Sequence, residues 1–253
     1  MVTLSNLYAQ HRGRVCDKWS LYLRVYEDLF ESKRSTALNL LEIGVQNGGS
    51  LELWAQYLPN AEHLVGCDIN PECGTLFFDD PRISVVVGDA NADEAFQSIK
   101  SICESYDVII DDGSHVPRDV VTSFLNYFPM LSPGGTYVVE DVHCDYLDSH
   151  VGGILQPFTS GNFFHCVVQL MNQSHWSAEL APETFASGFI PRESFPQFLK
   201  QRWIDSITFY DSIIIVRRAA SEGAGALGRR VIVGEIATVC SDPVVLRERL
   251  GSQ

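Results

Sequence analysis

The chain has 253 residues, of which 45% are hydrophobic, and a formal net charge of −14 at pH 7. This length is enough to bury a full core, so we expect one principal α/β domain with small additions. Because acidic residues outnumber basic ones by 32 to 18, the composition argues against a nucleic-acid partner and against an anionic membrane surface.

The sequence shows neither a secretory signal nor a membrane span. Its first twenty residues lack an apolar core segment, and the apolar runs are far shorter than the roughly 18 residues that a span requires. The seven cysteines form no CxxC pair, and an odd number fits a reducing compartment better than a disulfide framework. We therefore expect a cytoplasmic protein.

From Leu38 onward, short apolar runs alternate with amphipathic stretches. This alternation predicts a doubly wound, Rossmann-like α/β fold, with a mostly parallel sheet and helices on both faces. Strand-like pieces around Asp211 and Ser212 predict an antiparallel edge hairpin. The expected strands are residues 38–44, 63–69, 83–89, 106–112 and 134–141, and the expected helices are residues 50–58, 92–105, 118–131 and 163–173.

We expect three parts along the chain. Residues 1–37 are predicted to be a helical N-terminal lead-in or lid, in which Lys18, Trp19 and Tyr22 belong to the lid or to a dimer surface. Residues 38–218 are predicted to be the main domain. Residues 219–253 are predicted to be a linker, from the glycine-rich "SEGAGALG", followed by a strand and a terminal helix. A homo-oligomer is expected.

A glycine-containing loop joins the first expected strand to the first expected helix in "LLEIGVQNGGSLELW". Glycines such as Gly44 and Gly48 let a backbone approach a ligand closely, and open α/β sheets bind ligands at the carboxyl ends of their strands. Gln46 stands where a dinucleotide loop has its middle glycine, and Glu42 repels a pyrophosphate. The loop, with Ser50 at the start of the helix, therefore suits a cationic ligand.

Acids also end the second and third expected strands. Asp68, with Ile69 beside it, can accept both hydroxyls of a ribose. Asp89 and Ala90 fall where an adenine edge would lie. Alternatively, the glycines only form a turn and the acids only cap helices. Acids at three successive strand ends favour a nucleotide-like cofactor.

With these residues the chain resembles the class I S-adenosylmethionine-dependent methyltransferases. In that family the glycine loop holds the methionine part of the cofactor, the acid after the second strand holds the ribose, and the acid after the third strand lies by the adenine. The resemblance implies these roles for Gly44 and its neighbours, for Asp68 and for Asp89, with S-adenosylmethionine as the cofactor.

Two pairs of acids end the fourth and fifth expected strands, in "IDDGSH" and "EDVH". Neighbouring strands lie about 4.8 Å apart, so these carboxylates repel one another unless a cation intervenes. Mg²⁺ prefers such oxygen ligands. We predict Asp112, Glu140 and Asp141 as metal ligands and Asp111 as a cofactor contact. Two alternatives are Asp111 as a ligand, and acids that cap the following helices.

Histidines follow both pairs. His115 comes three residues after Asp112, where an imidazole can take a proton from a metal-acidified hydroxyl. The two motifs resemble those of the metal-dependent sugar O-methyltransferases of the mycinamicin and macrocin type, with cephalosporin-hydroxylase-like proteins as relatives. The resemblance covers roughly residues 17–175 and implies a Mg²⁺ site and His115 as general base. His143 is the rival base or a substrate contact.

The predicted activity is transfer of a methyl group to a hydroxyl of a sugar in a polysaccharide, an O-antigen or a glycosylated natural product. The first alternative is a catechol or phenolic O-methyltransferase. Such enzymes usually end the second motif with Asp-Asn, so the Glu140–Asp141 pair favours a sugar. The second alternative is a non-catalytic S-adenosylmethionine-binding protein, because a fold alone does not prove chemistry.

Overall fold

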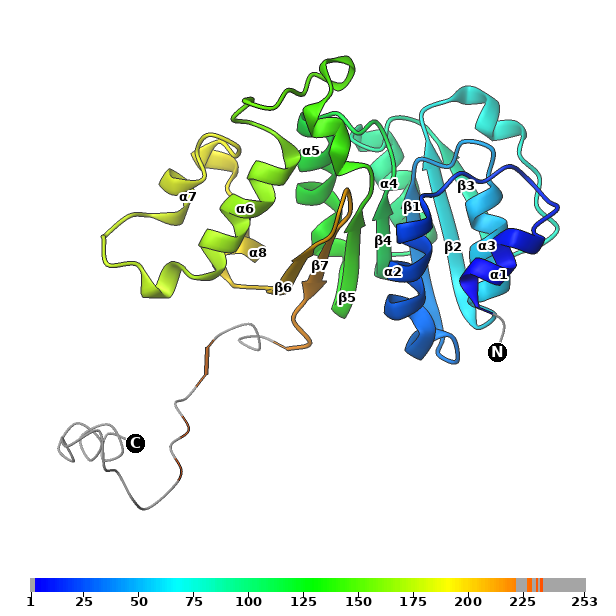
Figure 1. The fold of residues 1–253 in the computed structure, drawn as a ribbon, viewed down its shortest axis with the longest axis horizontal. Helices are drawn as coiled ribbons and strands as arrows, with labels where there is room; N and C mark the ends of the chain where they lie inside the picture. The colour runs from blue at the N-terminus through cyan, green and yellow to red at the C-terminus, as the bar shows by residue number, and fades with distance from the viewer. Residues whose placement is uncertain (1–2, 222–226, 229–230, 232, 234–253) are drawn as a thin grey trace.

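The structure, a computed structural model, describes residues 3–221, 227–228, 231 and 233. A seven-stranded sheet in the order β3-β2-β1-β4-β5-β7-β6 forms the centre of the molecule (Figure 1). The strands are β1 Leu38–Ile43, β2 Ala61–Asp68, β3 Ile83–Val87, β4 Tyr106–Asp111, β5 Leu131–Val139, β6 Ile204–Phe209 and β7 Ile214–Arg218.

The sheet has the predicted topology. Strands β1 to β5 pair in parallel, whereas β7 pairs antiparallel with both β5 and β6. Asp211 and Ser212 lie in the turn between β6 and β7, where the hairpin was expected. The prediction of a doubly wound, mostly parallel sheet with an antiparallel edge is therefore confirmed.

Helices cover both faces of this sheet (Figure 1). The α-helices are α1 Leu4–Gln10, α2 Ser20–Phe30, α3 Gly49–Tyr57, α4 Asp93–Ile102, α5 Pro117–Tyr127, α6 Ser160–Met171, α7 Pro182–Phe185 and α8 Gln197–Lys200. Short 3₁₀ helices are η1 Glu31–Lys33, η2 Pro71–Thr75, η3 Phe128–Met130, η4 Val142–Tyr146, η5 Asp148–His150, η6 Gln173–His175 and η7 Arg192–Ser194.

Strands β1 to β5 and β7 supply side chains to two separate cores, because successive residues of a strand point to opposite faces. In β4, Val108 and Ile110 pack in the core under α1, α2 and α3, whereas Ile109 packs in the core under α4, α5 and α6. On the first face Trp54 of α3 contacts the Tyr26 ring of α2 edge-on. Helix α2 is thus part of the layer that covers the sheet.

Several expected boundaries were wrong by a few residues, among them those of α5 and β5. The helix predicted over 118–131 ends at Tyr127, and η3 follows it. Pro129 has no backbone N–H to donate, so the α-helix cannot continue through it. Strand β5 begins at Leu131 rather than at 134 and ends at Val139, so Glu140 and Asp141 follow the strand. The side chains of Glu140 and Asp141 therefore need not point to opposite faces of the sheet, as successive residues of a strand do.

The predicted strand and helix after residue 228 lie outside the described residues, apart from positions 231 and 233. The division of the chain into three parts, a cytoplasmic location and a homo-oligomer all stay predictions. Among the described residues, no helix is both long and apolar enough to cross a membrane.

Candidate functional site

A cavity of about 520 Å³ lies at the carboxyl ends of β1 to β5. The residues after each of these strands line it, and an N-terminal segment, residues 15–19, forms a further wall. All the site residues predicted from the sequence line this cavity except Glu42 and Gly48. The strand-end acids that are distant in sequence therefore share one space.

The glycine loop has a left-handed backbone at Gly44 and Gly48, a conformation that glycine adopts more easily than other residues. Gly44 has φ +90°, and a Cβ there would lie 1.9 Å from the carbonyl oxygen of Asp112. Gly48 has φ +80° and precedes α3, but a Cβ on it would meet the Phe78 ring rather than the cavity. Gly44 therefore brings the loop against the end of β4, whereas Gly48 serves the turn into α3.

Gly44→Ala should destabilise the protein far more than the same change at Gly134. Gly134 has φ +80° with nothing within 4 Å of its added Cβ, so its substitution adds only left-handed strain, about 1–2 kcal/mol. Gly44 adds a backbone clash to a similar strain. Urea unfolding of both variants measures the difference. Equal losses of unfolding free energy would contradict the close approach of Gly44 to Asp112.

Asp68 ties the glycine loop to the end of β2. Its Oδ2 accepts hydrogen bonds from the backbone N–H groups of Val45 and Gln46 at 2.8 and 2.7 Å, and its Oδ1 accepts one from Asn70 at 2.8 Å. Oδ2 accepts two hydrogen bonds and Oδ1 only one, so Oδ1 keeps a lone pair for a ligand, and Asp68 lines the cavity. The predicted contact with ribose hydroxyls is compatible with this geometry and stays a prediction.

The residues after β3 occupy the next part of the cavity wall. Asp89 Oδ1 accepts a hydrogen bond from the backbone N–H of Asn91 at 2.9 Å, and the Ala90 carbonyl accepts one from the Tyr127 hydroxyl at 2.6 Å. Ile69, after β2, exposes 70% of its surface and lines the same cavity. The apolar side chain of Ile69 and the hydrogen-bonded turn at Asp89 and Ala90 could thus contact a flat ring such as adenine.

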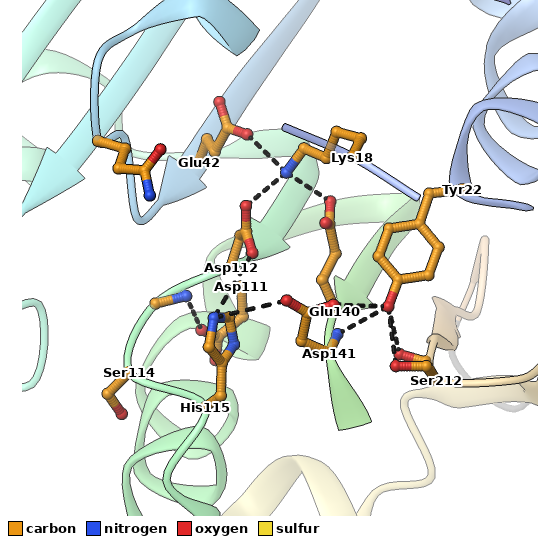
Figure 2. A network of polar contacts seen from close by, with 12 residues as sticks. Lys18, Tyr22, Glu42, Asp111, Asp112, Ser114, His115, Glu140, Asp141 and Ser212 are labelled. Carbon is orange, nitrogen blue, oxygen red and sulfur yellow. Dashed lines mark hydrogen bonds and ion pairs between the residues drawn. The ribbon is translucent and has the colours of Figure 1, made fainter. Parts of the chain in front are cut away.

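Asp111 and Asp112 point in different directions. Asp111 is buried and accepts a hydrogen bond from the Tyr137 hydroxyl at 3.3 Å and one from the backbone N–H of Gly113. Burial raises the pKa of Asp111 to about 7. Asp112 instead faces the N-terminal segment and His115 (Figure 2). The sequence alternative of Asp111 as a metal ligand therefore has less geometric support than Asp112.

Asp112, His115 and Asp141 form a group that fits a divalent cation. One ligand atom from each lies within 4.8 Å of the others. His115 Nε2 is 3.9 Å from Asp112 Oδ1 and 3.7 Å from Asp141 Oδ2 (Figure 2). His115 and Asp141 both have left-handed backbone, with φ +55° and +54°. Two carboxylates suit a hard cation such as Mg²⁺, which completes its coordination with water and substrate oxygens.

Glu140, the third predicted ligand, lies outside that group. Its Oε1 is 2.9 Å from the Lys18 Nζ and accepts a hydrogen bond from the Tyr26 hydroxyl. Burial and the charge of Asp112 raise the pKa of Glu140, although the Lys18 charge opposes this. Glu140 as a metal ligand stays a prediction.

The sequence interpretation missed the position of Lys18. Its side chain is only 2% exposed, so it lies inside the site, and the interpretation as lid or dimer surface does not describe this geometry. A partial signal was present in Tyr22 and Tyr26, since positions four apart lie on one face of a helix, and Lys18 lies two residues before that helix begins. Here that face meets the strand-end acids.

Tyr22 and Ser212 are two further site residues that sequence reasoning did not find. The Tyr22 hydroxyl donates to Asp141 Oδ1 at 2.8 Å and also contacts Ser212 Oγ at 2.9 Å. Ser212 Oγ lies 2.5 Å from His143 Nδ1. The tip of the edge hairpin thus fixes both Asp141 and His143, and no sequence signal links a turn residue to a histidine 69 positions earlier.

Residues 41–142 match a family model described as a methyltransferase domain. This segment includes the glycine loop and both acidic motifs. The predicted resemblance to class I methyltransferases is therefore confirmed.

Curated relatives act on sugars of natural products. The chain is 29% identical over 223 residues to the 8-demethyl-8-alpha-L-rhamnosyl tetracenomycin-C 2'-O-methyltransferase of Streptomyces olivaceus, covering 84% of this chain and 54% of that protein. It is 36% identical over 128 residues to the mycinamicin VI 2''-O-methyltransferase of Micromonospora griseorubida, covering 48% of this chain and 31% of that protein. The chain thus spans about half or less of the length of these relatives.

A solved structure has the same fold. The MycE methyltransferase from the mycinamycin biosynthetic pathway, in complex with Mg, SAH and mycinamycin VI, superposes with a TM-score of 0.64 and 24% identity. The match covers 81% of this chain and 51% of that one. This likeness confirms the fold that the sequence predicted.

Proposed function

We propose that this chain, in which residues 41–142 form a methyltransferase domain, moves the methyl group of S-adenosylmethionine to a sugar hydroxyl in a Mg²⁺-dependent reaction. The observation that carries the proposal is the group of Asp112, His115 and Asp141 in the same cavity as the glycine loop and Asp68. A methyl donor and an activated hydroxyl need to meet in such a shared space, because positioning supplies much of the rate.

The cofactor half of the proposal rests on β1, β2 and β3. Gly44 and its neighbours would hold the methionine part, Asp68 the ribose, and Asp89 with Ala90 the adenine. These residues follow the carboxyl ends of β1, β2 and β3, which are adjacent in the sheet. Open α/β sheets bind ligands in the crevice at these ends. The solved MycE structure contains SAH, the demethylated product of this cofactor, in a domain of the same fold.

The acceptor half rests on β4 and β5. Bound Mg²⁺ would lower the pKa of an acceptor hydroxyl. Asp112 and Asp141 would hold the ion with further oxygens from water and the acceptor, and Glu140 is proposed as a third ligand. His115, adjacent to both carboxylates, would accept the hydroxyl proton on Nε2. The oxygen then attacks the sulfonium methyl in line, and the carbon–sulfur bond breaks.

The sugar acceptor is supported by the relatives, whose names place their methyl groups on sugars of tetracenomycin and mycinamicin. The acid pair after β5 also ends in Glu140–Asp141 rather than in Asp-Asn. A phenolic acceptor is the competing proposal, and its lower pKa would need less help from a base such as His115.

Methyl transfer from labelled S-adenosylmethionine to a panel of glycosylated natural products, free sugars and catechols tests this function. We expect transfer to a sugar hydroxyl that EDTA abolishes and added Mg²⁺ restores. Transfer to catechols alone would favour the phenolic alternative. Cofactor binding without any transfer would favour a non-catalytic protein.

A further inference from the structure

We propose that Lys18 is a positioning residue for the metal site, one that holds Asp112 in the orientation that a divalent cation requires. This inference rests on the proposed Mg²⁺ site. The Lys18 ammonium lies among carboxylates from three neighbouring strand ends, as Figure 2 shows. Its Nζ is 2.5 Å from Asp112 Oδ2, 2.9 Å from Glu140 Oε1 and 3.5 Å from Glu42 Oε1.

The two oxygens of Asp112 have different neighbours. Oδ2 accepts a hydrogen bond from Lys18, and Oδ1 faces His115. Lys18 and a metal ion can therefore use the same carboxylate at the same time, one oxygen each. If the Lys18 ammonium contacted Asp112 Oδ1, it would compete with the metal ion for that oxygen. It contacts Oδ2 instead.

The positive charge of Lys18 counters the mutual repulsion of Glu42, Asp112 and Glu140. Glu42 and Glu140 are buried, whereas the Asp112 side chain is 21% exposed at the cavity. Without a cation among them, Asp112 is the acid that can rotate toward water, because the other two are enclosed. That rotation would move Oδ1 away from His115 and Asp141.

Lys18 is buried beside its ion-pair partners. Carboxylates of Glu42, Asp112 and Glu140 surround its ammonium in place of water. Helix α2 anchors the segment that carries Lys18, since Tyr22 and Tyr26 are both buried in the core. The ammonium is thus held rigidly at the point where the strand ends meet, as an outer partner of metal ligands is expected to be.

The test is Mg²⁺ affinity, measured by calorimetry on metal-stripped protein without cofactor. Lys18→Met keeps the length of the side chain and removes its charge, and we expect binding to weaken by about ten- to a hundredfold, the range for loss of such partners. Lys200→Met is the matched control, because Lys200 is 43% exposed, contacts Glu183 and the Phe195 ring, and does not line the cavity. Its Mg²⁺ affinity should equal that of the unsubstituted protein.

Tighter or unchanged Mg²⁺ binding by folded Lys18→Met would overturn the inference, because a competing ammonium predicts tighter binding and an uninvolved one predicts no change. If Lys18→Met does not fold, the double variant Lys18→Met, Glu42→Gln removes one acid together with the cation. Its affinity should fall below that of Glu42→Gln alone, and equal affinities would also overturn the inference. Absence of Mg²⁺ binding in the unsubstituted protein would instead contradict the proposed function.

Discussion

His115→Ala should lower kcat for sugar methylation by about a hundred- to ten-thousandfold, the range that a positioned general base contributes. The His115 ring lies where an acceptor hydroxyl on the proposed ion would need to lose its proton, 3.7 Å from Asp141 and 3.9 Å from Asp112. The glycine loop and Asp68 do not depend on this ring. Affinity for S-adenosylhomocysteine should therefore stay within about threefold, which calorimetry measures alongside the turnover assay.

Two further variants separate the possible roles of the histidines. His143→Ala removes the rival base, whose Nδ1 contacts Ser212 Oγ and whose ring meets the edge of Trp19. His165→Ala is a control, since that ring is exposed on α6 and stacks on Phe209. Loss of turnover in His143→Ala with little change in His115→Ala would exchange the two roles. Loss of Mg²⁺ binding in His115→Ala would show that His115 acts as a ligand.

The fold could be predicted because its signals are local. Each parallel strand is a short apolar run, and α3, α4 and α5 each follow a loop at the end of such a run. The same rules place Asp68, Asp89 and Asp112 at the carboxyl ends of strands. Because these strands run parallel in one sheet, their carboxyl ends lie along the same edge. The shared cavity thus follows from topology alone.

The rest could not be predicted, because it depends on contacts between distant segments. Glu140 and Asp141 are adjacent in sequence, yet left-handed backbone at Asp141 turns it toward His115 while Glu140 meets Lys18. Ser212 reaches Asp141 through Tyr22 from a separate hairpin. Helices α7 and α8 have four residues each, which is too short for a periodic pattern to stand out.

The double variant Asp112→Asn, Asp141→Asn should lower Mg²⁺ affinity by more than about a hundredfold and abolish metal-dependent turnover. Both substitutions keep the shape of the side chain but remove the charge that a hard cation requires. Asp112 and Asp141 approach each other from the ends of β4 and β5, with His115 between them. Calorimetry on metal-stripped protein measures the affinity, and added Mg²⁺ tests whether turnover returns.

A matched control removes the same charge elsewhere, by Asp79→Asn with Asp205→Asn, since both acids are exposed and neither lines the cavity. If that control weakens Mg²⁺ binding equally, the effect comes from net charge and not from ligation. Glu140→Gln decides the third ligand. Weaker binding is expected if Glu140 leaves Lys18 to reach the ion, because a carboxylate oxygen is then lost from the ion's coordination. Unchanged binding would restrict the carboxylate ligands to Asp112 and Asp141, with Glu140 acting on Lys18 and Tyr26 alone.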